Sequence, residues 1–174
     1  MSRLLVVSML AVMLVPAHTA GQTTEPSRPF AWDVARAVLI DPTTYVPAIV
    51  SYEVMMKDWK SSQVLFAHGW LEVNPGFTVS GLAGDVPVSY DEGKRLIGRE
   101  SLVILQYSAL NNVAVGIGER LLIAKYPQRR TLIRTVSWIE RIAYASVMTY
   151  LNTSEHLRQA RANARLARDH GYTR

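Results

Sequence analysis

The sequence predicts an all-α protein: a helical bundle of about four to five helices with one long ordered loop, preceded by a signal peptide. Two observations predict this class. From residue 30 onward, apolar residues recur at helical spacing in several long segments. Residues 74–94, which are rich in glycine, proline and aspartate, lack any sustained period and are expected to form the loop. With 174 residues, the chain is long enough for one domain with its own core.

The composition favours a membrane setting or a large buried interior, because 49% of the residues are hydrophobic and 19% are charged. The chain has no cysteine. This excludes a disulfide framework, a thiolate metal site and lipid attachment through an N-terminal cysteine.

The N-terminal segment has the pattern of a secretory signal. Arg3 precedes the apolar run 4–17, and small and polar residues follow. The run is shorter than the roughly 20 residues that a bilayer span needs. We therefore expect residues 1–21 to be a signal peptide, with an uncleaved anchor as the alternative, and the polar residues 22–29 to be a linker. Either form sends the chain into the export pathway.

The helical part begins with a short helix over residues 31–40. It should stop at Asp41 because the residue before a proline, here Pro42, avoids the α region. Thr43 or Thr44 is then expected to cap the next helix.

This second helix is predicted to be long. Pro47 falls in its expected first turn, where a missing N–H costs little. The helix should run to about His68 and end at Gly69, a favourable residue after a helix C-terminus. The loop 74–94 follows.

The third helix is expected over residues 90–124 and contains the uncharged run 101–118. This run, about 18 residues long, reaches the lower limit for a transmembrane helix. Polar residues nevertheless fall on one line of the helix, which should face other helices rather than lipid. They are Ser101, Ser108, Asn112 and Glu119.

A basic turn separates this helix from the next one, expected over residues 131–151. Asn152 and Glu155 resemble a capping box, so a separate basic helix is expected over 152–174, after a helical domain over 30–151. Four arginines of this last helix form a stripe that could hold anionic lipid headgroups or simply be solvated. They are Arg158, Arg161, Arg165 and Arg168.

The sequence shows no catalytic, nucleotide or metal motif, and no histidine pair has the spacing of metal ligands on one helix face, so no cofactor is expected. Asp58 and Glu72 are two carboxylates in an otherwise apolar region, where burial would raise a pKa enough for acid–base chemistry. The alternative is local bonding, with Glu72 accepting from backbone N–H groups and Asp58 bonding with Ser62.

Residues 58–75 carry a short signature formed by Asp58, Ser61, Gly69, Glu72, Asn74 and Pro75. It resembles the D-x-x-T, G-x-x-E-x-N-P pattern of a group of small multi-pass prokaryotic membrane proteins of unknown function, with serine in place of threonine. The resemblance implies that the aspartate lies on a hydrophobic helix and that E-x-N-P marks the turn out of it. It implies no activity.

These observations predict a non-catalytic, exported helical protein of the cell envelope, associated with the inner membrane, with a structural or binding role. Its partners would be inner-membrane lipid or an envelope protein, and nucleic acid is excluded because no aromatic residues interleave the basic ones. One alternative is a soluble periplasmic binding or scaffolding module; another is an acid–base enzyme that uses Asp58 and Glu72. The residues expected to form an internal polar cluster are Asp58, Glu72, Asn74, Asn111, Asn112 and Arg141.

Overall fold

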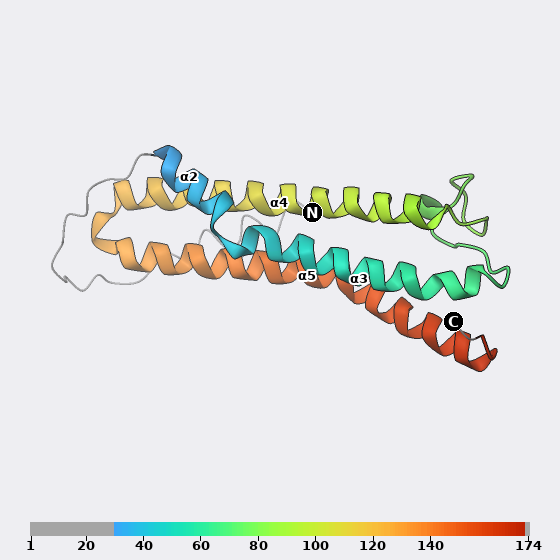
Figure 1. The fold of residues 1–174 in the computed structure, drawn as a ribbon. Helices are drawn as coiled ribbons and strands as arrows, with labels where there is room; N and C mark the ends of the chain where they lie inside the picture. Colours follow the sequence, from blue (N-terminus) through green and yellow to red (C-terminus); the bar gives the residue numbers. More distant parts are fainter. Residues whose placement is uncertain (1–29, 173–174) are drawn as a thin grey trace.

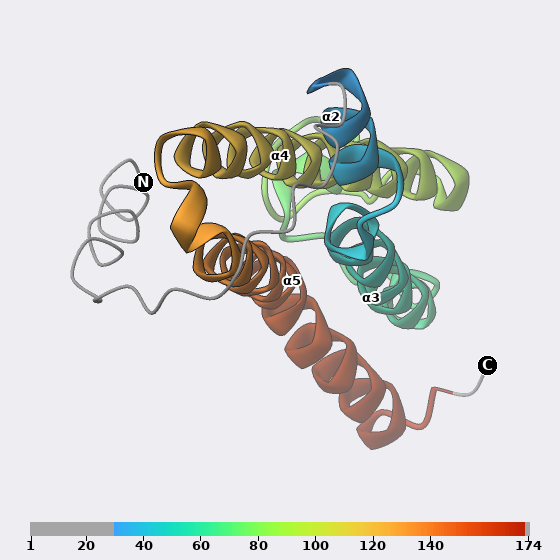
Figure 2. The same cartoon turned by 90° about the vertical axis from the view of Figure 1, so that its left-hand side faces the viewer.

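A computed structural model of the protein describes residues 30–172, and this part of the chain is helical, so the predicted all-α bundle is confirmed (Figure 1). Three long helices run side by side, and the short α2 lies beside α3 and α4 (Figure 2). The predicted signal peptide (1–21) and linker (22–29) lie outside the described residues. The helices are α2 (Phe30–Leu39), α3 (Pro42–Phe66), α4 (Tyr90–Lys125) and α5 (Arg130–Asp169).

The start of α3 differs from the prediction. Asp41 is the N-cap residue: its carboxylate accepts a hydrogen bond from the backbone N–H of Thr43 at 3.0 Å, and Pro42 follows as the first helical residue. Aspartate is as good a cap as threonine, and proline fits the first position of a helix, so the predicted cap at Thr43 or Thr44 is wrong. Pro47 consequently lies inside the helix rather than in its first turn.

The end of α3 lies close to the predicted exit. The helix ends at Phe66, and Gly69 adopts a φ of 83°, which is strained for a residue with a side chain. Its N–H donates to the carbonyl of Phe66 at 3.0 Å, and the N–H of Trp70 donates to that of Leu65 at 3.2 Å. These bonds satisfy carbonyls that the helix end would leave open.

The covering loop, residues 67–89, joins α3 to α4 and is ordered by its own backbone bonds. Glu72 pairs with Asp85 and Thr78 with Pro87 in isolated β-bridges, and Pro75–Phe77 form a short 3-10 turn, η2. The N-cap Ser89 then starts α4 by accepting from the N–H of Glu92 at 3.2 Å. The last residues of the range predicted as loop, 90–94, are therefore helical.

The predicted helix break at Asn152 is wrong, because α5 runs without interruption for 40 residues. The side chains of Thr149, Asn152 and Thr153 each donate to the backbone carbonyl four residues earlier, at 2.7 to 2.8 Å. Polar residues that form such bonds stay within a helix. The sequence pattern of a cap was present, but no glycine or proline stands there to end the preceding turn.

The apolar core lies between α3 and α4. Trp59 is 4% exposed, and its indole N–H donates to the carbonyl of Tyr90 at 3.1 Å. Its ring lies against Gly93, where an added Cβ would come within 2.3 Å of the indole. The close approach of α4 to α3 therefore depends on a glycine at this position. The buried core residues are Ala48, Met55, Met56, Trp59, Ile97 and Ile104.

Candidate functional site

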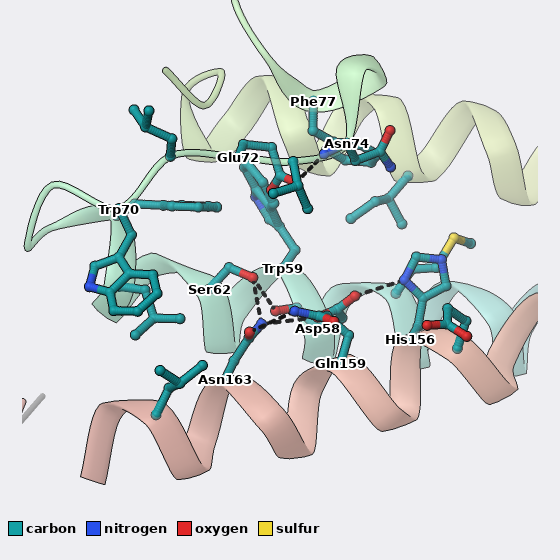
Figure 3. Close-up of a pocket in the computed structure, with 18 residues that line it drawn as sticks. Asp58, Trp59, Ser62, Trp70, Glu72, Asn74, Phe77, His156, Gln159 and Asn163 are labelled. Carbon is teal, nitrogen blue, oxygen red and sulfur yellow. Dashed lines mark hydrogen bonds and ion pairs between the residues drawn. The ribbon is translucent and has the colours of Figure 1, made fainter. Parts of the chain in front are cut away.

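A pocket of about 400 Å³ lies where the covering loop passes over α3 and α5 (Figure 3). Polar side chains of α3 and α5 form one side of it, which we call the polar floor. Residues of the covering loop, including Trp70, Glu72 and Phe77, line the opposite side. The polar floor consists of Asp58, Ser62, His156, Gln159 and Asn163.

Asp58 is the centre of the polar floor. Its Oδ2 lies 2.8 Å from Nδ1 of His156, and its Oδ1 accepts from Nδ2 of Asn163 at 3.3 Å. The carboxylate of Asp58 raises the pKa of His156 through this hydrogen bond, against the opposing effect of burial. The aspartate on α3 is therefore joined to α5 through two different side chains.

Asn163 extends the network and is 3% exposed. Its Nδ2 also donates to Oγ of Ser62 at 2.8 Å and lies 3.2 Å from Oγ of Ser61, while its Oδ1 accepts from Nε2 of Gln159 at 3.0 Å. Asparagine can serve both serine and glutamine in this way because it carries a donor and an acceptor.

The predicted local bond between Asp58 and Ser62 is present, but it uses the backbone. Both serine hydroxyls donate to the carbonyl oxygen of Asp58, Ser61 at 2.7 Å and Ser62 at 3.2 Å. The carboxylate is thereby left for α5. Since both of its oxygens already accept hydrogen bonds, Asp58 is arranged as an anchor rather than as an exposed base.

Glu72 and Asn74 hold the turn that leads into the covering loop. Oε1 of Glu72 accepts from the backbone N–H of Asn74 at 2.7 Å, and Oδ1 of Asn74 accepts from that of Gly76 at 3.0 Å. Glu72 thus bonds to the backbone, one of the two roles the sequence suggested. Glu72, Asn74 and Asp58 line the same pocket.

The other residues expected in the polar cluster lie elsewhere, in the interior near the start of α3. Nδ2 of Asn112 donates to Oγ1 of Thr44 at 2.7 Å and to Oγ1 of Thr43 at 2.9 Å. Asn111 donates to Oε2 of Glu140 at 3.4 Å. This level of the bundle is about 22 Å from Asp58 along α3, given the rise of about 1.5 Å per helical residue.

Arg141 belongs to this second group as well. It donates to Oδ2 of Asp41 at 3.4 Å and to Oε2 of Glu119 at 3.2 Å. All of these side chains are shielded, with exposures of 15% for Arg141, 16% for Asp41 and 22% for Glu119. The residues predicted as one cluster therefore fall into two groups, one at the pocket and one in the interior.

Sequence reasoning missed several members of both groups. His156 and Asn163 are seven positions apart on α5, a spacing that indicates a shared face, but the sequence alone gives no reason to pair that face with Asp58. Asp41 was predicted only to end the preceding helix. Pairings between residues about 100 positions apart leave no local signal that could have identified them.

The outer surface of the same interior region carries large apolar side chains. Interhelical bonds of Asn112 and Arg141 place the start of α3 and the middle parts of α4 and α5 at one level. From Leu102 to Leu121 along α4, this surface is about 28 Å tall. We call it the apolar belt; it consists of Val46, Ile49, Val50, Leu102, Val103, Tyr107, Leu110, Leu121, Trp138, Ile139, Ile142, Val147, Tyr150 and Leu151.

In the described part of the chain, α4 is the one helix long and apolar enough to cross a membrane, and 17% of its most apolar window is buried. The predicted polar line of this helix faces inward: Ser101, Ser108 and Asn112 are buried. Between residues 101 and 110, the exposed side chains of α4 are apolar or aromatic except for Gln106.

The arginine stripe lies on the face of α5 that points away from α3, and its residues are exposed. Arg158 pairs with Glu155 on the same helix. No group of three or more histidine, aspartate or glutamate side chains within residues 30–172 could hold a metal ion.

Searches of protein-family models, curated protein sequences and solved structures found no match to this chain.

Proposed function

We propose that the protein is a membrane-embedded helical protein of the cell envelope, located in the inner membrane, with a non-catalytic structural or binding role. The observation that carries this proposal is the arrangement of the half of the bundle that bears the apolar belt. We call it the belt half: residues 42–50 of α3, 101–121 of α4 and 134–151 of α5. Most of its exposed side chains are large and apolar, although Gln106 and Arg134 are exposed as well, and most of its buried side chains are small or polar.

The exterior supports lipid contact. Residues 101–118 of α4 carry no charge, and neither do residues 142–154 of α5. The belt is about as tall as the hydrocarbon core of a bilayer, roughly 30 Å. A water-soluble monomer rarely leaves so many large apolar side chains exposed on neighbouring helices.

The interior supports the same setting. Small or polar residues predominate among the buried side chains of the belt half, such as Thr44, Ser108, Asn112 and Ser137. Small residues let helices approach closely where lipid supplies no hydrophobic drive for association, and polar ones bond across the contact. Arg141 and Glu119, whose charges would be costly in lipid, bond to each other in the belt half, and Arg141 also bonds to Asp41 at its edge. The charge of Arg134, 51% exposed, lies 3.9 Å from Glu119.

Charged residues flank the belt at both ends. Arg99 and Glu100 lie just before it on α4, while Lys125 and Arg130 follow it at the turn into α5. The arginine stripe begins at Arg158, about 10 Å beyond the last belt residue, whereas each headgroup layer is roughly 5 to 8 Å thick. In this proposal most of the stripe lies in water rather than among lipid headgroups.

Extraction of cell membranes with alkaline carbonate tests the proposal. The full chain should stay in the membrane pellet, and release into the supernatant would refute an integral membrane protein.

Two matched variants sharpen the test. Leu110, 64% exposed, lies in the belt, and Leu82, 68% exposed, lies in the covering loop. Leu110→Lys should lower the amount of inserted protein, because lysine near the centre of a span costs about 2.5 to 3.5 kcal/mol. Leu82→Lys should not.

The second candidate is the soluble periplasmic module, in which another copy of the chain would cover the belt. It predicts release by osmotic shock and an oligomer in solution. Equal fractionation of the Leu110→Lys and Leu82→Lys variants in the soluble pool would favour it over the membrane role.

A further inference from the structure

We infer that the pocket beneath the covering loop binds a small organic cation: an ammonium group carried on an aromatic or branched aliphatic body. The lining of the pocket supports this inference, which goes beyond the membrane role proposed above. It holds equally for an embedded and for a soluble protein, because the pocket lies outside the apolar belt.

The charged residues that line the pocket favour a ligand with a positive charge. Asp58, Glu72 and Glu155 line it, and His156 is its one cationic candidate. In the described chain, lysine and arginine are absent from the lining. An anionic ligand would meet repulsion here, and a cation would be attracted.

The aromatic residues that line the pocket favour a ligand with an apolar or aromatic part. Rings of Trp59, Phe66 and Phe77 lie together, with Trp59 at 5.6 Å from Phe66 and 5.3 Å from Phe77 between ring centroids. Trp70, a residue of the covering loop, also lines the pocket (Figure 3). Indole and phenyl faces pack well against apolar groups and also attract cations. The volume of about 400 Å³ falls within the range of small-molecule sites.

The bonds of the polar floor have a structural role of their own. The bonds of Asp58 with His156 and Asn163 fasten α5 to α3 and need no ligand. A second carboxylate, Glu72, faces the same cavity from the covering loop. Its Oε1 holds the turn by accepting from the N–H of Asn74, while its Oε2 accepts no hydrogen bond from the described residues and is open to solvent. An ammonium group in the pocket would supply donors to it.

Because His156 lies beside Asp58, the affinity for a cation should depend on pH. A cation beside Asp58 competes with the positive charge on His156, so its binding should favour neutral His156. The carboxylates that influence His156 come from each neighbouring element: Asp58 from α3, Glu100 from α4 and Glu155 from α5, with Glu72 on the loop across the pocket. Affinity for a cation should therefore rise with pH as His156 loses its proton, whereas affinity for a neutral ligand should not.

Calorimetric titration of the full chain in a nonionic detergent tests this with probes that share one body: 2-phenylethylammonium, 2-phenylethanol and phenylacetate. We expect the ammonium probe to bind at least about tenfold more tightly than the others, a difference of one power of ten in Kd. Glu72→Gln keeps an acceptor for Asn74 and should weaken the ammonium probe several-fold. Glu53→Gln, on the exposed side of α3, is the matched control and should leave its affinity unchanged.

Repeating the titration at several pH values gives a second measurement. Affinity for the ammonium probe should increase between about pH 6 and pH 8 in the wild type, and this increase should be lost in His156→Gln. Equal or tighter binding of the alcohol or the acid overturns the inference, as does a failure of all probes to bind. If carbonate releases the protein and the protein still prefers the ammonium probe, the membrane role is refuted and the cation-binding inference stands.

Discussion

The belt half and the pocket half, which we define as residues 51–66 of α3, 90–100 of α4 and 152–169 of α5, differ in the kind of side chain that fills most of the interior. In the pocket half, Trp59 and Ile97 are buried, and charged side chains cover the same helices outside. In the belt half, Ser108 and Asn112 are buried and Leu110 is exposed. Because the same three helices form both halves, the difference arises from the residues at successive turns and not from a change of fold. The membrane role proposed above requires such a difference, because one half would then meet water and the other lipid.

Helix α4 shows how a single helix face can serve both halves. Its inward positions run from Gly93 and Ile97 through Ser101 and Ile104 to Ser108 and Asn112. The spacing of three and four residues is constant, so one stripe faces α3 and α5 throughout. The chemistry of that stripe changes from apolar to polar about halfway along, and the exposed faces change in the opposite direction.

The largest expected effect comes from breaking the ion pairs inside the belt half. Arg141→Ala should lower the free energy of unfolding by about 3 to 5 kcal/mol, because it leaves Asp41 shielded and without its cation, and leaves Glu119 with Arg134 at 3.9 Å. Denaturant titration in detergent, followed by circular dichroism, measures this change.

The matched control is Arg158→Ala in the pocket half. Arg158 and Glu155 are also an ion pair, but their side chains are 75% and 67% exposed. Exposed pairs contribute less than about 1 kcal/mol, so this variant should unfold almost like the wild type. Similar losses in the two variants would contradict the view that the belt half hides its charges from the solvent.

The next effect tests the packing of the pocket half. Gly93→Ala should destabilise the protein by about 1 to 3 kcal/mol, the usual cost of inserting a group into a filled core. The added Cβ would lie 2.3 Å from the ring of Trp59, and the indole is held by its bond to Tyr90. Thermal unfolding measures the loss.

Gly98→Ala, on the same helix, is the control. Nothing lies within 4 Å of a Cβ built at Gly98. Alanine is the better helix former by about 1 kcal/mol, so this change should leave the unfolding temperature unchanged or raise it. A loss equal to that of Gly93→Ala would show that α4 responds to any substitution of its glycines, and the close contact with Trp59 would not be the cause.

The sequence predicted the features that depend on local spacing. The bounds of α4 and the inward line of Ser101, Ser108 and Asn112 follow from helical periodicity, and the structure confirms both. Helix ends were harder, because Asp41 and Thr43 are both good caps and the choice depends on Pro42. The division of the polar residues into two groups could not be predicted, since it depends on which distant side chain each one meets.

The smallest expected effect is the pH dependence of stability that comes from the Asp58–His156 pair in the polar floor. The carboxylate of Asp58 raises the pKa of His156, so the charged pair stabilises the fold fully below the ordinary histidine pKa of about 6.5. That contribution is lost as pH rises through the higher pKa of the folded state. Between about pH 6 and pH 9, the unfolding temperature of the wild type should therefore fall relative to that of His156→Gln. His170→Gln, which leaves the pair intact, should follow the wild type. Parallel pH profiles of the wild type and His156→Gln would mean that a neutral hydrogen bond joins Asp58 to His156. The pocket half would then hold α5 to α3 without an ion pair, in contrast to the ion pairs of Arg141 in the belt half.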